Sequence, residues 1–170
     1  MRVAADGVSV DLPPGWEARI ARTSRGDGST QPVEPGAPVE RRREVSPPIL
    51  HAATVPLPAE RGDYGSSVVE LLGPTDVFVA LVDMGAEVAG RGLYRLQGLP
   101  DALSRAYFSP DRLQRAIPGQ LGTQAFFTEG GRGWALYVVL GSQQAAADLL
   151  GRVSELLAGV AIEALPDGPA

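Results

Sequence analysis

Alternating apolar and polar residues predict strands near the N-terminus of the chain. Val8–Leu12 alternates with a period of two, and so does Trp16–Ile20. This period is typical of a strand with one buried face. Pro13-Pro14-Gly15 separates the two runs and favours a turn, because proline fixes φ and glycine permits a positive φ. The pattern predicts a β-hairpin over residues 8–20.

Residues 22–48 have no apolar period and are rich in Gly, Pro and Arg. Such a segment buries little and predicts a long mobile loop. Loops of this length in a compact domain are either functional or disordered. Four of the five arginines in this segment are candidates for contact with a phosphate or an acidic partner surface, and the alternative is a solvated loop. These are Arg25, Arg41, Arg42 and Arg43.

The middle of the chain predicts two strands and a short helix. Ile49–Leu57 is an apolar stretch that favours a strand, and its prolines place the last residues at an edge. Ser67 and Glu70 have the spacing of a capping box, which predicts a helix over Val68–Leu72. Val77–Met84 is apolar at odd and even positions alike, which is typical of a central strand buried on both faces.

Residues 85–122 are punctuated by glycines and predict irregular structure. Short strands are expected within this region at Leu93–Leu96 and Tyr107–Phe108.

The clearest pattern lies near the C-terminus. Thr123–Thr128 and Trp134–Leu140 flank a glycine-rich turn and predict a β-hairpin. Ser142 is then expected to cap a helix. An apolar stripe at helical spacing follows, and Gly159 stands where that helix should end. The members of the stripe are Leu149, Leu150, Val153, Leu156, Leu157 and Val160.

The order of these elements defines the predicted fold class. Strands mostly follow strands, and helices do not alternate with them, which favours an α+β fold over a doubly wound one. We expect an antiparallel sheet on which a short helix and a long C-terminal helix pack. A single domain is expected over residues 1–165, with a disordered tail at 166–170.

The residue types restrict the chemistry available. The chain has no cysteine and one histidine, and all 15 basic residues are arginine. Thiolate, zinc-thiolate and iron–sulfur chemistry are thereby excluded, and ligand counting predicts neither a metal site nor a cofactor. His51, Asp63 and Ser66 or Ser67 could be written as a catalytic triad, but their spacing carries no signature. We therefore expect His51 to be an ordinary strand histidine and the protein to be no enzyme.

Charge and hydropathy bear on partners and location. The net charge of −5 argues against nucleic-acid binding. The longest apolar runs fall far short of the roughly 20 residues of a membrane-spanning helix. The first residues lack the apolar core of a secretory signal, so a cytoplasmic location is expected.

The stretch Val8–Trp16, with its Pro-Pro-Gly turn and Trp, resembles the opening of the PsbP/Mog1-like superfamily. The C-terminal order of paired strands followed by a helix, from Phe126 to Val160, is similar to the end of the same fold. The chain also resembles small actinobacterial proteins of this kind. The resemblance implies an α+β architecture and an action through binding other proteins, which is a fold-level analogy.

Two functional hypotheses follow. The first is a non-catalytic protein-binding or assembly module, an adaptor or a structural subunit, which contacts its partner through the four loop arginines and Arg132. Such a module could also form homo-oligomers through an open edge strand. The second is a small-ligand-binding protein or enzyme with a pocket between sheet and helix. His51, Asp83, Tyr94, Tyr107 and Arg132 are the residues expected to line that pocket.

Overall fold

The structure, a computed structural model, describes residues 1–22 and 47–166. The predictions for Arg25, Arg41, Arg42 and Arg43, and for the tail at 167–170, lie outside the described residues. Within the described ranges the chain forms eight strands and two α-helices. The strands are β1 (Arg2–Ala5), β2 (Val8–Asp11), β3 (Glu17–Arg22), β4 (Pro48–Ala53), β5 (Val77–Gly85), β6 (Leu121–Glu129), β7 (Arg132–Leu140) and β8 (Val160–Ile162); the helices are α1 (Ser66–Val69) and α2 (Ala146–Ala158).

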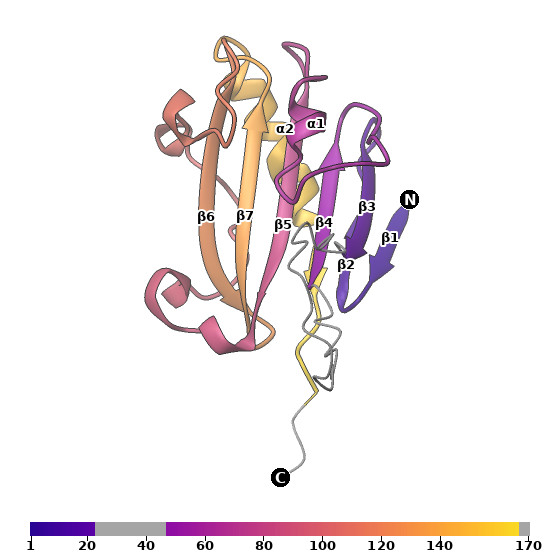
Figure 1. The fold of residues 1–170 in the computed structure, drawn as a ribbon, viewed down its shortest axis with the longest axis vertical. Helices are drawn as coiled ribbons and strands as arrows, with labels where there is room; N and C mark the ends of the chain where they lie inside the picture. The colour runs from indigo at the N-terminus through magenta and orange to yellow at the C-terminus, as the bar shows by residue number, and fades with distance from the viewer. Residues whose placement is uncertain (23–46, 167–170) are drawn as a thin grey trace, which may run out of the picture.

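The strands form two antiparallel sheets. The larger sheet has the order β3-β4-β5-β7-β6, and the smaller has the order β1-β2-β8. The predicted α+β class and the antiparallel pairing are confirmed. Figure 1 shows α2 behind the large sheet, with β6 at one margin of that sheet and β3 toward the other.

Two apolar layers lie on the two faces of the large sheet. On one face α2 and the small sheet cover the alternate residues of β5 and β7, and Trp134, Leu136 and Leu156 are fully buried there. On the other face α1 and the following loops cover Phe78, Tyr137 and their neighbours. β5 is therefore buried on both faces, as its continuous apolar run predicts.

The predicted hairpin over residues 8–20 is wrong. Both of its strands exist, but β2 pairs with β1 and β8, and β3 pairs with β4 in the other sheet. Periodicity reports that a strand has a buried face and does not report its partner. The actual hairpin joins β1 to β2 through Asp6-Gly7, both with positive φ (53° and 77°). This Asp-Gly pair is a type I′ turn signal that sequence reasoning missed.

The predicted loop at 22–48 is one residue too long at each end. Arg22 and Pro48 belong to β3 and β4 and lie opposite one another in the antiparallel pair. The strand expected over Ile49–Leu57 ends at Ala53. The Thr54 amide still donates to the Val77 carbonyl at 3.1 Å, and its hydroxyl donates to an Asp76 carboxylate oxygen at 2.9 Å.

The C-terminal hairpin is confirmed, but the helix after it starts later than expected. β6 and β7 are joined by Gly130 and Gly131, with φ of 61° and 77°. The hydroxyl of Ser142 accepts from the Gln144 amide in a turn and does not cap α2, which begins at Ala146. α2 ends before Gly159, as predicted. A side chain at Gly159 would collide with the backbone of β2, so close approach requires glycine there.

The cap predicted at Ser67 is also wrong. α1 begins after Gly65, which has a φ of 67° and lies against the ring of Phe78 with no room for a Cβ. The Ser67 hydroxyl donates to the Glu60 carbonyl at 2.7 Å instead. Phe78 therefore requires glycine at the N-cap position of the helix, and a contact so distant in the sequence leaves no local signal.

The short strands expected at Leu93–Leu96 and Tyr107–Phe108 are 3₁₀ turns, at Gly92–Arg95 and Arg105–Tyr107. Two further 3₁₀ turns are at Ala86–Val88 and Pro110–Arg112. Gly90, Gly92 and Gly98 have positive φ, which prevents a continuous extended backbone in this region.

Candidate functional site: an open edge on β6

Asp83 and Arg132, two of the residues predicted to line a pocket, form a buried ion pair. Arg132 Nη1 lies 2.7 Å from Asp83 Oδ2, and the two side chains are 9% and 6% exposed. The other Asp83 carboxylate oxygen accepts from the Gly85 amide at 2.8 Å. This bond spans the register shift in β5 between Asp83 and Gly85. The Asp83 carboxylate therefore stabilises the register shift in β5 as well as pairing with Arg132.

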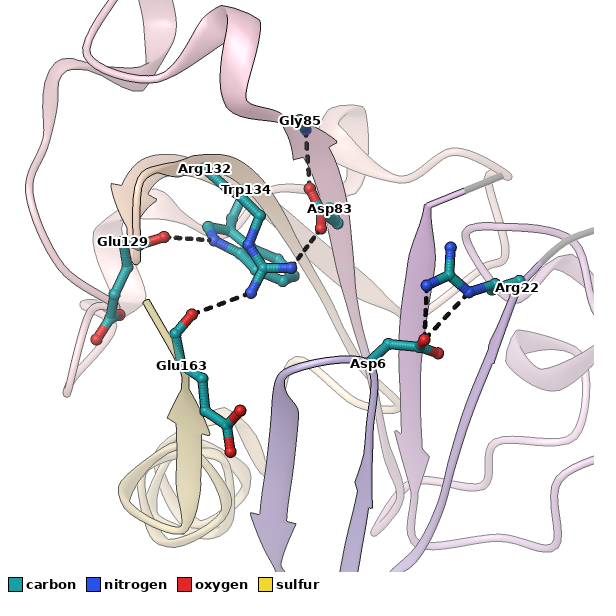
Figure 2. A network of polar contacts seen from close by, with 8 residues as sticks. All are labelled: Asp6, Arg22, Asp83, Gly85, Glu129, Arg132, Trp134 and Glu163. Carbon is teal, nitrogen blue, oxygen red and sulfur yellow. Dashed lines mark hydrogen bonds and ion pairs between the residues drawn. The ribbon is translucent and has the colours of Figure 1, made fainter. Parts of the chain in front are cut away.

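Arg132 also joins the two sheets. Its Nη2 donates to the Glu163 carbonyl, just after β8, at 3.2 Å. Its guanidinium lies 4.7 Å from the centre of the Trp134 ring (Figure 2). The Nε atom is buried and has no hydrogen-bond partner within the described part of the chain. Because the side chain is buried and both terminal nitrogens are engaged internally, Arg132 is structural in this arrangement and is not presented to a partner.

His51 lies buried in β4 and is enclosed by a second polar cluster. Its Nε2 is 2.8 Å from the Asp63 carbonyl oxygen, and Arg61 Nε donates to its Nδ1 at 3.1 Å. A carbonyl can only accept, so Nε2 carries the proton and Nδ1 is the acceptor. His51 is therefore held neutral. Burial lowers the pKa of His51, and the positive charge of Arg61 lowers it further, against the raising effect of the Asp63 carbonyl.

The contacts of His51, Asp63 and Ser67 are not those of a hydrolytic triad. His51 contacts the backbone of Asp63 and not its carboxylate. The Ser67 hydroxyl is engaged with Glu60. The interpretation of His51 as a structural strand histidine fits these contacts.

Tyr94 and Tyr107 lie near opposite ends of β6. The ring of Tyr94 packs edge-to-face on Phe126, with 5.6 Å between ring centres. The Tyr107 carbonyl accepts from the Thr123 hydroxyl at 2.9 Å, and its side chain is 60% exposed. Of the five residues expected in one pocket, the structure brings Asp83 and Arg132 into direct contact. None of the five lines the cavity beside β6.

The outer edge of β6 offers unpaired backbone groups. Along a strand, the N–H and C=O of alternate residues point to the same side. Gly122 exchanges two bonds with Ser109 at 3.0 and 3.1 Å, and Thr128 bonds Leu96 and Gly98 at 2.8 Å each. Gln124 and Phe126 share this phase, so their N–H and C=O also point away from β7.

Within the described residues, no bond to these four groups of Gln124 and Phe126 exists. We call this stretch of edge, between the Ser109 and Leu96–Gly98 pairings, the β6 slot.

A cavity of about 420 Å³ lies directly beside the β6 slot. Its lining residues are Asp111, Arg112, Leu113, Gln114, Gln124 and Phe126. The first four form a wall across the face of β6, and Gly122 makes that wall possible, because a Cβ there would collide with Leu113. The Gln114 amide donates to the buried Tyr137 hydroxyl at 2.8 Å and anchors the wall.

A second wall covers the same face near the other end of the slot. Tyr94 packs on Phe126 and also against Gly133 of β7, where a Cβ would collide with Val88 and crowd the Tyr94 ring. Figure 1 shows the two corresponding loop regions beside the two ends of β6, with the middle of the strand between them. Gly122 of β6 and Gly133 of β7 thus leave the space in which the two walls pack.

The sequence predicts an open edge strand but does not locate it, and the position of the β6 slot is a backbone feature that sequence reasoning missed. No residue type marks a strand whose edge is left unpaired, and Gln124 and Phe126 are ordinary members of an alternating run. The available signal was the order of elements, because a hairpin followed by a helix leaves one of its strands without a further partner.

The described residues offer little else for chemistry. No group of three or more His, Asp or Glu side chains converges there in a manner that could hold a metal ion. No helix in the same ranges has the length and apolar character needed to cross a membrane. No protein-family model, curated protein or solved structure matches the chain.

Proposed function

We propose that this protein is a non-catalytic protein-binding module that takes up an extended segment of a partner at the β6 slot. The observation that carries the proposal is the set of four unpaired peptide groups on Gln124 and Phe126, beside a cavity. An exposed strand edge is a template for strand addition, in which backbone bonds supply affinity and side-chain pockets supply specificity.

Exposed apolar side chains near both ends of the slot support the proposal. Leu93 is 68% exposed and Leu96 is 56% exposed, both by the Thr128 end, and Tyr107 lies by the Thr123 end. Large apolar side chains left in solvent around a groove are typical of an interaction surface.

The finer fold, a PsbP/Mog1-like domain, is part of this proposal. It is supported by the C-terminal half, where β6 and β7 pair and α2 follows. The N-terminal half gives no such support, because Val8–Trp16 does not form one hairpin. A cytoplasmic location stays a prediction.

The test uses the full chain with two matched variants. Gln124→Pro removes the outward N–H and places a ring in the slot, while the ladder to β7 keeps its bonds. Gln124→Ala keeps the backbone and serves as the control. A random peptide library displayed on phage is selected on the wild type, and the clones are then assayed on both variants.

We expect clones that bind Gln124→Pro at least about tenfold more weakly than Gln124→Ala, since both variants lack the Gln124 side chain and only the proline loses the N–H and fills the slot with its ring. Amide exchange at Gln124 and Phe126 should slow when a peptide is bound. If the enriched clones bind Gln124→Pro as tightly as the wild type, the proposal is wrong.

A further inference from the structure

The β6 slot is closed at both ends by the chain itself. Ser109 occupies the position opposite Gly122, and Leu96–Gly98 occupies the position beside Thr128. Gly122 and Thr128 are roughly 20 Å apart at about 3.3 Å per residue. Each closing segment takes up part of this length, which leaves room for about three residues of an added strand.

A long strand cannot lie in this slot. A strand continuing past Gly122 or Thr128 would overlap the backbone of Ser109 or of Leu96–Gly98. A second copy of the chain presents β6 with the same closing segments, so two copies brought edge to edge meet at these segments before their strands can pair. The closed ends therefore work as edge protection against open-ended association.

The faces of β6 determine which partner side chains meet the cavity. Residues directly opposite one another across a sheet carry their side chains on the same face. Gln124 and Phe126 line the cavity, so partner residues opposite them also point toward it. The partner residue between them, opposite Ala125, points to the face covered by α2.

The lining of the cavity favours an apolar side chain. Leu113 and the ring of Phe126 supply its apolar surface, and Gln114 and Gln124 are polar but uncharged. The two charged members, Asp111 and Arg112, have opposite signs. A charged partner side chain therefore gains little net attraction, whereas an apolar one removes surface from water.

We infer that the occupant of the β6 slot is a short extended peptide with a core of about three residues, in which the first and third side chains are apolar. This inference rests on the proposed function and specifies its ligand. The peptide enters and leaves away from the strand edge, as a loop tip, a chain end or a flexible segment does. Binding depends on backbone bonds and apolar contact, so it changes little with salt concentration.

The experiment scans a peptide of about twelve residues from the library selection, using fluorescence anisotropy with the full chain. Each position is changed in turn to alanine and, separately, to its N-methyl amide. N-methylation removes a donor and therefore reports which peptide N–H groups face β6. The scan is repeated at about 50 mM and about 500 mM salt, which changes screening of charges strongly.

We expect sensitivity confined to about three consecutive residues. For a peptide that pairs antiparallel to β6, N-methylation at the first and third residues should weaken binding about tenfold and the middle position should change little, because only the residues opposite Gln124 and Phe126 turn their N–H toward β6. Alanine at the first and third should weaken binding by a similar factor. Leu113→Ala should lessen the side-chain preference and keep the N-methyl pattern, whereas Arg115→Ala, which removes an exposed charge paired with Glu70 outside the cavity lining, should leave both unchanged.

Three outcomes would overturn the inference while leaving the proposed function in place. They are sensitivity spread over a long run of the peptide, no preference for apolar residues at alternate positions, and a concentration-dependent dimer that Gln124→Pro dissolves. Failure to select any peptide that depends on Gln124 would instead overturn the proposed function.

Discussion

The ion pair between Asp83 and Arg132 is predicted to be the most sensitive polar contact of the described fold. Asp83→Ala removes the charge partner of a guanidinium that stays buried, and it frees the Gly85 amide. The Glu163 carbonyl and the Trp134 ring remain as contacts of Arg132, and neither carries a full negative charge.

The magnitude follows from this burial. Removing one member of a buried pair costs about 3–5 kcal/mol, because the remaining charge is uncompensated. Loss of the Gly85 bond adds about 1 kcal/mol. We therefore expect Asp83→Ala to lower the free energy of unfolding by about 4–6 kcal/mol, which is a large part of the roughly 5–15 kcal/mol of a typical domain.

The double variant Asp83→Leu/Arg132→Met removes both charges and keeps the volume apolar. Replacement of a buried pair by apolar residues is often neutral or stabilising, so this variant should unfold at higher urea than Asp83→Ala. The exposed pair between Arg2 and Asp11 is the matched control, and Asp11→Ala should cost less than about 1 kcal/mol.

Urea denaturation followed by tryptophan fluorescence measures all four chains, since Trp134 touches the pair. Two results would refute the reasoning. One is a cost of Asp83→Ala below about 1 kcal/mol, as for an exposed pair. The other is a double variant less stable than Asp83→Ala, which would mean that an unpaired buried charge is not the main cost.

Three further predictions concern stability. His51 has a lowered pKa in the folded state, so the unfolded state binds more protons than the folded state as the pH falls below about 6.5. The wild type should therefore lose more free energy of unfolding between pH 7 and pH 5 than His51→Gln does. Equal losses would contradict the buried, neutral state of His51. Ala125→Pro removes a ladder bond to β7 and should lower the free energy of unfolding by about 3 kcal/mol or more. Gln124→Pro should lower it by about 1 kcal/mol or less, because the N–H of Gln124 points away from β7. Similar thermal melting points of the two variants would show that the wrong residues of β6 have been assigned to the open edge. In Gly141→Ala the new Cβ would collide with the Gly73 carbonyl, which should lower the free energy of unfolding by at least about 2 kcal/mol. In Gly151→Ala the new Cβ in α2 meets open space, which should raise it by about 1 kcal/mol. If urea unfolding shows that Gly141→Ala is as stable as the wild type, the close approach at Gly141 is refuted.

Local patterns in the sequence determined several elements. The continuous apolar run of β5 predicts burial on both faces, because only a central strand removes both sets of side chains from water. The glycine pair between β6 and β7 predicts their hairpin, since both positions require a positive φ. These features depend on residues close together in the chain, and local pattern is sufficient for them.

Tertiary structure decided which strands became partners and where the helices begin. β2 does not pair with β3, its expected partner, because β1 and β8 pair with both of its edges. α1 starts after Gly65 and not at the predicted Val68, and the ring of Phe78 leaves room only for glycine at position 65. Both causes involve residues far apart in sequence, so no local period could reveal them.

The position of the candidate site also depends on the tertiary structure. The composition, with one histidine and no cysteine, already disfavoured metal and thiol chemistry. The β6 slot consists of peptide groups, which every residue carries and no sequence pattern distinguishes. Whether such groups are paired depends on how two distant segments, at Ser109 and at Leu96–Gly98, meet the strand, and only the folded chain determines that.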